Sequence, residues 1–524
     1  MGKGEVRKKQ IQYYSYCIGA LLFLMFGKLI GNNGIVYLAI AMETMSLCMV
    51  LLGDGVADAY SKMLRIRRKR GQYFDALIVT RRIRVIQCVL AILFSVLIFV
   101  MADSIALKLF QMPKAALVIR ILTPVLFLRM IGTLLIGYFQ SFGAYSVIGI
   151  IYILRQILFW LLGSALCKNR MAYGEKVAGL LKNSDYVGMY GAIGLAIAIV
   201  ITEVIVLTAL IIYYFLVEHN YDKKKMDRNL HMAEPLGVTL RNYTYLSSNH
   251  VLLGYIKRIL VIVPFILLIS NVNDAGVFYG KFLVLCSIPV LLLCSRYALL
   301  YSRLCSLIRN KDNRMTRENI QTGILYTWSV SLLVAVLFSV MAPQISDAFF
   351  AQDAVMKSFL QYGSVLIVAV TMLIYLSIVH IAHNRKIECF GTLIFTVILN
   401  LILSKSMYSK SSKPETLILS SVISLFIGAL ILTALAVYLY NLRMEYIPIY
   451  VLPLICVGVS GVIVLLMTKS MTPHIGSTIS CFIGVILGTV LYVAALSLCR
   501  VFSDQEVERI YGSLGRKLFS FIFK

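Results

Sequence analysis

The sequence predicts an all-α membrane protein with about fourteen transmembrane helices. Three observations predict this class: the composition, the length of the apolar runs and the positions of lysine and arginine. Hydrophobic residues make up 60% of the 524 residues and charged residues only 14%, and the mean hydropathy is +0.86. Because a soluble domain usually carries about 25% charged residues, most of this chain is expected to lie in a bilayer.

The apolar runs have the length that a bilayer requires of a helix. A helix of about 20 residues crosses a hydrocarbon core of about 30 Å, and short polar clusters separate runs of this length along the chain. The predicted spans of the first half are residues 11–30, 35–60, 85–101, 116–140, 147–166 and 191–216. Those of the second half are residues 248–270, 277–300, 318–341, 358–381, 388–404, 416–440, 447–468 and 476–498.

The lysine and arginine residues divide the loops into two kinds. With the N-terminus in the cytoplasm, about 31 of the 50 basic residues fall in inner loops and tails, about 11 in outer loops and about 8 within the spans, as the positive-inside rule requires. A wrong number of spans would disturb this alternation. The pattern therefore predicts fourteen spans in the cell membrane with both termini cytoplasmic, and anionic lipid headgroups rather than nucleic acid explain the net charge of +26.

A weak internal repeat suggests two related helix bundles. Met101-Ala102 recurs as Met341-Ala342 and Ile105 as Ile345, at an offset of 240 residues. The predicted organisation is a cytoplasmic N-terminal tail (1–10), a first six-helix bundle (11–216), a basic cytoplasmic linker (217–247), a second six-helix bundle (248–440), two additional helices (441–498) and a cytoplasmic amphipathic tail (499–524). Pseudo-symmetric halves of this kind usually place a substrate pathway between them.

The sequence offers little support for a metal or redox centre. The eleven cysteines are scattered through apolar runs without a CxxC pair, which is typical of small buried hydrophobic residues. His380 and His383 lie three residues apart near the end of a predicted span. Two ligands without a third make a weak zinc site, so we interpret the pair as interfacial and expect no cofactor.

Basic residues within the predicted spans are the main functional signal, because each would cost about 2.5 to 3.5 kcal/mol if it faced lipid at a helix centre. They are Lys28, Arg120, Arg129, Arg155, Lys257, Arg258, Lys281 and Arg296. We interpret five of them as candidate substrate-binding residues: Lys28, Lys257, Arg258, Lys281 and Arg296. Three of these, Lys28, Lys281 and Arg296, lie near helix ends and could instead reach the interface. Lys257 and Arg258 lie deeper, and since they are about 100° apart at least one can face the protein interior.

Four carboxylates oppose these cations. Three of them lie within about 60° of one another on the second predicted helix and form an acidic stripe: Glu43, Asp54 and Asp58. The stripe either neutralises cations of neighbouring helices or binds a coupling proton or sodium ion. Glu203 stands alone in its span and is expected to pair with Arg155 or Arg129. Because eight cations oppose four carboxylates, an anionic ligand would balance the difference.

Several segments carry a family resemblance. They are Gly53-Asp-Gly-Val-Ala-Asp-Ala-Tyr-Ser-Lys62 with Arg70-Gly-Gln-Tyr73, Leu135-Ile-Gly-Tyr-Phe-Gln-Ser141, Gly276-Val-Phe-Tyr-Gly280 and the region of Asn400. These segments resemble the stage V sporulation protein B and polysaccharide-exporter branch of the multidrug/oligosaccharidyl-lipid/polysaccharide flippase superfamily. The resemblance covers nearly the whole chain through loose motifs, and it implies two six-helix bundles that work by alternating access.

The resemblance also implies a function and partners. Peptidoglycan-precursor flippases of this superfamily place several arginines in the cavity on the first, second and eighth helices. Here helix 1 offers Lys28, helix 8 offers Lys281 and Arg296, and helix 2 is acidic instead. The implied protein is a transporter rather than an enzyme, which moves an anionic polyprenyl-diphosphate-linked saccharide from the inner to the outer leaflet for polysaccharide or peptidoglycan synthesis. Its implied partners are the bilayer and glycosyltransferases or a polymerase of the same pathway.

Three alternatives stay open. A multidrug/toxin extruder of amphipathic cations would prefer an acidic cavity, which the excess of cations does not favour. A membrane glycosyltransferase or polymerase commonly needs a large loop with acidic residues, and no segment between the predicted spans exceeds about 30 residues. A non-transporting scaffold of a polysaccharide assembly complex is the third, because the arginine pattern of the flippases is absent.

Overall fold

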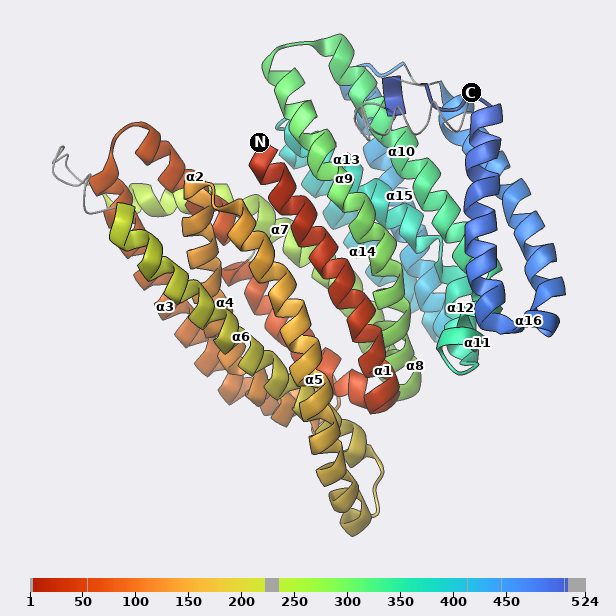
Figure 1. The fold of residues 1–524 in the computed structure, drawn as a ribbon, viewed down its shortest axis with the longest axis horizontal. Coiled ribbons are helices and arrows are strands. Elements are labelled where there is room, and N and C mark those ends of the chain that lie inside the picture. Colours follow the sequence, from red (N-terminus) through yellow and green to blue (C-terminus); the bar gives the residue numbers. More distant parts are fainter. Residues whose placement is uncertain are drawn as a thin grey trace. The chain divides into compact units, whose positions relative to one another are not determined.

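The computed structural model describes residues 3–53, 55–221, 235–411, 413–443, 445–503 and 505–507. Within this part of the chain every regular element is a helix (Figure 1), which confirms the predicted all-α class. A helix satisfies all its backbone hydrogen-bonding groups internally, as a segment in a bilayer must.

Most helices cover a predicted span and extend beyond it, but the predicted spans 35–60 and 358–381 are interrupted, after Leu52 and after Gly363. Those of the first half are α1 (Lys3–Leu52), α2 (Val56–Lys69), α3 (Tyr73–Ser104), α4 (Ala115–Phe142), α5 (Tyr145–Leu181), α6 (Asp185–Tyr221) and α7 (Leu236–Leu268). Those of the second half are α8 (Val272–Val277), α9 (Leu283–Arg309), α10 (Asn313–Val340), α11 (Ala342–Phe349), α12 (Ala354–Gly363), α13 (Leu366–Ala382), α14 (Lys386–Ser411), α15 (Pro414–Tyr440) and α16 (Leu452–Leu498). Three π-helical segments are η1 (Ile105–Leu109), η3 (Phe278–Phe282) and η4 (Ile447–Val451).

The described chain contains eleven or twelve helical segments that could each cross a membrane. Eleven helical segments of the described chain are long and apolar enough to span a bilayer, and α12 with α13, bent by 46°, makes a twelfth. Two of the eleven, Gly4–Lys69 and Ile447–Leu498, contain 66 and 52 residues, enough for two crossings each at about 20 residues per crossing. Counting these two segments twice gives about fourteen spans.

Both long segments break at a glycine. The backbone angles are φ 69° and ψ 174° at Gly31, and φ 79° and ψ 161° at Gly476. This region of backbone space is open essentially only to glycine. The first break lies within the predicted outer turn 31–34 and the second directly after the predicted turn 469–475, so each glycine joins two spans.

By its packing, the chain divides into two units. Leu22–Gly280 forms the N-terminal unit, and Met1–Leu21 together with Lys281–Lys524 forms the C-terminal unit. By this division α7 belongs to the N-terminal unit. The physical reason is that α7 packs on earlier helices: Gln87 Nε2 of α3, for example, donates a hydrogen bond to Tyr243 Oη of α7 at 2.6 Å.

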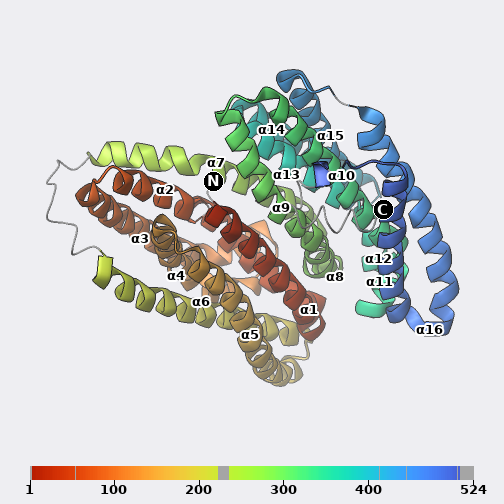
Figure 2. The same ribbon diagram turned by 45° about the horizontal axis from the view of Figure 1, so that its top comes forward.

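Close approach at glycines holds the N-terminal unit together. Gly194 of α6 faces the α5 backbone, where an added Cβ would lie 2.7 Å from the carbonyl oxygen of Leu166. Gly137 of α4 faces Ala57 of α2 in the same way. Small residues let membrane helices pack closely. The α5 and α6 helices pack along one another and extend together past the neighbouring helices of this unit (Figures 1 and 2).

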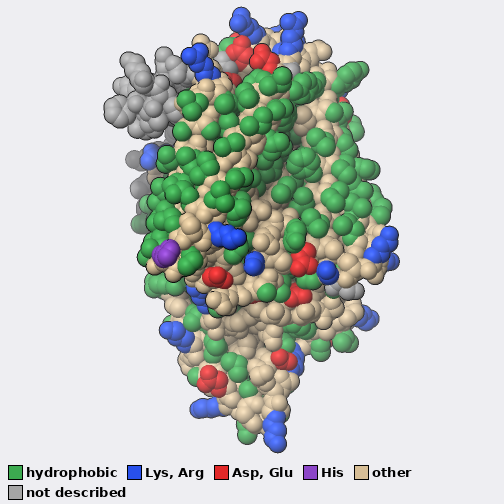
Figure 3. Space-filling model, turned by 90° about the vertical axis from the view of Figure 1, so that its right-hand side faces the viewer, with side chains coloured by type: hydrophobic (Ala, Val, Ile, Leu, Met, Phe, Trp, Pro, Cys, Tyr) green, Lys and Arg blue, Asp and Glu red, His purple; other side chains and the backbone are tan. Residues whose placement is uncertain are grey.

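Buried polar side chains join helices of the C-terminal unit. Asn400 Nδ2 of α14 donates to Ser421 Oγ and Ser424 Oγ of α15 at 3.1 and 3.0 Å, and Ser404 Oγ lies 2.8 Å from Ser420 Oγ. Hydrogen bonds of this kind hold membrane helices in register. The exposed side chains of α16 are mostly apolar, and Figure 3 shows hydrophobic side chains gathered over one face, as lipid contact requires.

Three predictions fall wholly or partly outside the described residues. They concern Asp54 of the acidic stripe, residues 222–234 of the predicted basic linker and residues 508–524 of the predicted amphipathic tail. The described ends of that linker belong to α6, which continues to Tyr221, and to α7, which begins at Leu236.

Candidate substrate site

The first charged cluster of the N-terminal unit surrounds Glu43, which lies on α1 after the Gly31 break. Only 1% of its side chain is exposed. Glu43 Oε1 accepts hydrogen bonds from Arg258 Nη1 at 3.1 Å and from Tyr279 Oη at 2.6 Å, and Oε2 accepts one from Ser46 Oγ at 3.1 Å. Donors of this kind compensate the burial of a carboxylate. Glu43 therefore balances the charge of Arg258.

Lys257 and Arg258 are neighbours on α7 but have different surroundings. Arg258 is held by Glu43, while 42% of its side chain stays exposed. Lys257 is exposed and makes no hydrogen bond or ion pair with any residue that the structure describes. Of these two neighbouring cations, only Arg258 is bound by a carboxylate among the described residues.

The second charged cluster surrounds Glu203 of α6, whose side chain is 3% exposed. Arg129 Nε of α4 lies 2.7 Å from Glu203 Oε1, and Arg155 Nη2 of α5 lies 3.3 Å from Oε2. The sequence predicted a pair with one of these arginines, and both bind the same carboxylate. Arg155 Nε is buried and has no hydrogen-bond partner among the described residues. Three helices therefore meet at one ion cluster that contains two guanidinium groups.

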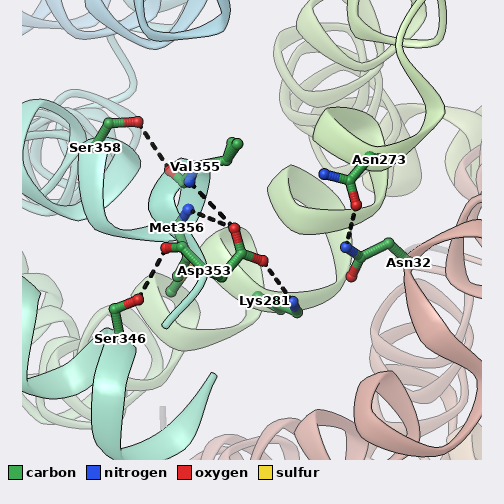
Figure 4. Close-up of polar contacts among 8 residues, drawn as sticks. All are labelled: Asn32, Asn273, Lys281, Ser346, Asp353, Val355, Met356 and Ser358. Carbon is green, nitrogen blue, oxygen red and sulfur yellow. Dashed lines mark hydrogen bonds and ion pairs between the residues drawn. The ribbon is translucent and has the colours of Figure 1, made fainter. Parts of the chain in front are cut away.

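Lys281, a predicted substrate contact, is held by a carboxylate within the C-terminal unit. Its Nζ lies 2.7 Å from Asp353 Oδ2 (Figure 4), and the two side chains are only 14% and 13% exposed. Asp353 also caps α12, because its Oδ1 accepts hydrogen bonds from the backbone N–H groups of Val355 and Met356. This ion pair anchors the start of α12 and leaves Lys281 little freedom to follow a substrate.

The other predicted site residues are dispersed. Lys28 on α1 is exposed and has no ion pair or hydrogen bond within the described part of the chain, and Arg296 lies half-buried on α9. Asp58 lies on α2, where it accepts a hydrogen bond from Gln140 Nε2 at 2.7 Å. Because the left-handed Gly55 (φ 77°) separates α1 from α2, Glu43 and Asp58 do not share one continuous helix face.

Two features near Glu43 were not predicted from the pattern of spans and charges. Tyr279 completes the shell of Glu43 from η3. Just before it, Gly276 packs so closely on the backbone of Asn32 that an added Cβ would clash with the Asn32 carbonyl oxygen. Asn32 Nδ2 also donates to Asn273 Oδ1 (Figure 4). The signal in the sequence was the glycine-bounded segment that resembles the flippase family.

The described residues contain no group of three or more His, Cys, Asp or Glu side chains arranged to hold a metal. The two ring nitrogens of His380 contact the Leu432 carbonyl oxygen and Tyr440 Oη. His380 therefore has no free nitrogen with which to join His383 as a metal ligand.

Solved structures of membrane transporters share this architecture. The sequence matches no protein-family model and none of the curated proteins. An inward-facing multidrug resistance MATE family transporter of the MOP superfamily matches with a TM-score of 0.66 and 14% identity over 84% of this chain and 98% of that chain. The lipid II flippase MurJ, in an inward closed conformation, matches with a TM-score of 0.64 and 13% identity over 93% of this chain and 97% of that chain.

A third structure is a MOP superfamily transporter from Pyrococcus furiosus, for which reverse polarity of the binding pocket suggests a different function. It matches with a TM-score of 0.60 and 13% identity over 83% of this chain and 94% of that chain. This chain has the fold of these transporters. The likeness agrees with the superfamily that the sequence motifs indicated, at the level of fold.

Proposed function

We propose that this protein is a flippase that moves a polyprenyl-diphosphate-linked saccharide from the inner to the outer leaflet. The observation that carries the proposal is the excess of cationic groups in the membrane-embedded part of the N-terminal unit. The single carboxylate of Glu203 is bound by two arginines. Lys257, next to Arg258, is exposed and has no hydrogen bond or ion pair with a described residue. An anionic headgroup is the substrate chemistry that this charge pattern favours.

A diphosphate headgroup matches these residues in chemistry. Arginine binds phosphate oxygens through two parallel N–H donors, and lysine acts as a flexible point charge. Arg258 is oriented by Glu43 and 42% of its side chain is exposed. Its guanidinium is therefore already ordered and can contact a ligand. The polyprenyl chain can stay in lipid while the headgroup crosses beside these cations.

The assignment to a branch of the superfamily, a membrane and a pathway rests on the family resemblance and on the similarity of fold to MurJ. We place the protein in the stage V sporulation protein B and polysaccharide-exporter branch, in the cell membrane, with both termini in the cytoplasm. Its substrate would then come from glycosyltransferases and pass to a polymerase of polysaccharide or peptidoglycan synthesis. Alternating access of the two halves would be driven by a coupling proton or sodium ion.

A second candidate is extrusion of amphipathic cations, as in a multidrug transporter. The TM-score of 0.66 with a MATE family transporter favours it as much as the score of 0.64 with MurJ favours a flippase. The charge pattern distinguishes the two, because a cationic drug needs an available carboxylate. Glu43 and Glu203 are 1% and 3% exposed and already bind arginine.

Proteoliposomes can decide between these functions. The purified chain is reconstituted, and the movement of a fluorescent polyprenyl-diphosphate sugar is compared with the efflux of a cationic dye, with protein-free vesicles as the control. We expect the anionic lipid to cross faster than in the control vesicles and the dye to leave at the control rate. Dye efflux without lipid movement would establish the extruder, and neither activity would favour a scaffold.

A further inference from the structure

A polar cluster around His380, in the C-terminal unit, joins the end of α13 to α15. His380 of α13 is 0% exposed. One ring nitrogen, Nε2, lies 3.1 Å from the carbonyl oxygen of Leu432, and the other, Nδ1, lies 2.9 Å from Tyr440 Oη. Both partners belong to α15, so a single imidazole links two helices through two hydrogen bonds.

The hydrogen-bond partners determine where the protons lie. A carbonyl oxygen only accepts, so Nε2 must carry the ring proton and donate it to Leu432. In the neutral imidazole Nδ1 is then an acceptor, and the Tyr440 hydroxyl donates to it. A neutral ring thus satisfies both of its nitrogens in this arrangement.

His383 lies between this cluster and the surface. Its ring stacks on Tyr440, with 4.0 Å between centroids and an interplanar angle of 26°. Its Nδ1 donates to the carbonyl oxygen of Val379 at 2.9 Å, which leaves Nε2 as the nitrogen that can exchange a proton with water. Burial lowers the pKa of His383, so this ring is neutral at physiological pH.

The groups around His380 offer no counter-charge at contact distance within the described chain. From α14, Glu388 is half-buried and binds Arg385 at 3.1 Å, and Cys389 Sγ lies 3.9 Å from the Ser377 carbonyl oxygen. Phenol groups join α13 to α9 and α10: Tyr297 Oη of α9 contacts the Thr371 carbonyl oxygen, and Tyr375 Oη of α13 contacts the carbonyl oxygens of Asn319 and Ile320. A charged imidazolium would be buried here without a carboxylate to balance it.

We propose that His380 is a proton-binding site that controls the contact between α13 and α15. An acid in the surrounding water gives its proton to Nδ1, and the imidazole becomes an imidazolium with two N–H donors. The Tyr440 hydroxyl can no longer donate to Nδ1, and it must turn its own proton away to accept from the new N–H. This bond reverses its direction, but the buried charge has no carboxylate at contact distance, so hydration is favoured and the ends of the two helices separate.

The surrounding helices allow such a movement. The α13 helix is the second limb of a pair bent by 46°, and three residues after its end the chain enters α14. Separation at His380 therefore requires a change at the bend and at a short turn, while the rest of each helix stays intact. The proposal concerns proton binding in the C-terminal unit and does not depend on the substrate.

Hydrogen exchange of the full-length protein in detergent, followed by mass spectrometry, tests the proposal. Peptides that cover residues 376–384 and 432–441 are compared at pH 8 and pH 5.5 after correction for the intrinsic exchange rate. Below the ordinary histidine pKa of about 6.5, an opening that admits one proton should become about tenfold more populated per pH unit. Wild-type protein should therefore show faster corrected exchange in both peptides at the lower pH.

The His380→Gln variant is the decisive comparison. Glutamine can donate to Leu432 and accept from Tyr440, but it cannot take up a proton, so the corrected exchange should no longer depend on pH. The matched control is His383→Gln, which should keep the wild-type response. An unchanged pH response in His380→Gln, or no response in wild type, would overturn the proposal.

Tyr440→Phe provides an independent check, should His380→Gln fail to fold. Without the hydroxyl, the closed, neutral imidazole loses its bond at Nδ1, while the open, hydrated imidazolium loses none. The acid-induced increase in exchange should therefore begin at a higher pH than in wild type. An onset at the wild-type pH or below would contradict the assignment of His380 as the proton acceptor.

Discussion

Glu43 and Glu203 are two carboxylates of the N-terminal unit with nearly equal burial and different surroundings. Their side chains are 1% and 3% exposed. Glu43 binds one arginine, a phenol hydroxyl and a serine hydroxyl. Glu203 binds two arginines, one of which keeps a buried Nε without a described partner. Burial alone therefore does not tell what a membrane carboxylate does.

The two clusters differ in the ratio of negative to positive charge. At Glu43 one negative charge meets one positive charge, and neutral hydroxyls supply the remaining hydrogen bonds. At Glu203 one negative charge serves two guanidinium groups. Both carboxylates orient arginines, and neither is available to a cationic substrate. The first cluster is a balanced anchor, and the second is the more cationic of the two.

The largest effect is expected for Glu203→Gln. Removing this charge leaves two arginines without their shared carboxylate. Arg129 is 41% exposed, but Arg155 is only 18% exposed, and the loss of one partner from a buried ion pair costs about 3 to 5 kcal/mol. The free energy of unfolding in detergent, or the shift of the unfolding midpoint together with the yield of folded protein, measures this loss. A stability equal to that of wild type would show that the arginines do not depend on Glu203.

Glu43→Gln should destabilise the protein less, by about 1 to 3 kcal/mol. Arg258, the arginine that binds Glu43, has 42% of its side chain exposed, so water can hydrate its charge when the carboxylate is removed. The double variant Glu43→Gln with Arg258→Gln should recover most of the loss, because no charge is then left unbalanced. The corresponding double variant Glu203→Gln with Arg155→Gln should recover only part, since Arg129 remains. Equal recovery at the two clusters would remove the distinction between them.

Tyr279→Phe should have the smallest effect on stability. It removes one of the donors to Glu43 and leaves Arg258 and Ser46 in place, so a loss of about 1 to 2 kcal/mol is expected. Thermal unfolding measures it, and Tyr245→Phe on α7, where the tyrosine is 65% exposed, is the control. A loss as large as that of Glu203→Gln would mean that the phenol, not the arginine, holds Glu43.

Much of the fold could be predicted from the sequence, and the reason is physical. Apolar runs must match the bilayer, so the breaks at Gly31 and Gly476 fall within or beside the predicted outer turns. The unit boundary at Gly280 could not be predicted, because it depends on the packing of α7 side chains such as Tyr243 on earlier helices.

The site was predicted less completely. Charges inside spans identified Arg258, Glu43, Glu203, Arg129 and Arg155, because charge in a bilayer needs a partner. The partner of Lys281 lies 72 residues away, in a turn between two predicted spans, where an aspartate carries no such signal. The acidic stripe assumed one helix through residues 35–60, and the chain leaves the helix at Gly55.

The charge reversal of Lys257 and Arg258 tests the central claim, that these cations contact an anionic headgroup. The double variant Lys257→Glu with Arg258→Glu is reconstituted in proteoliposomes, and the movement of a fluorescent polyprenyl-diphosphate sugar is measured at equal amounts of folded protein. Arg241→Glu, an exposed change near the start of the same helix, is the matched control. The account predicts that the double variant loses at least about tenfold in flipping rate, or ~1.4 kcal/mol, while the control keeps the wild-type rate. Flipping at the wild-type rate by the folded double variant would contradict the account and leave Lys28 and Arg296 as the exposed or half-buried candidates.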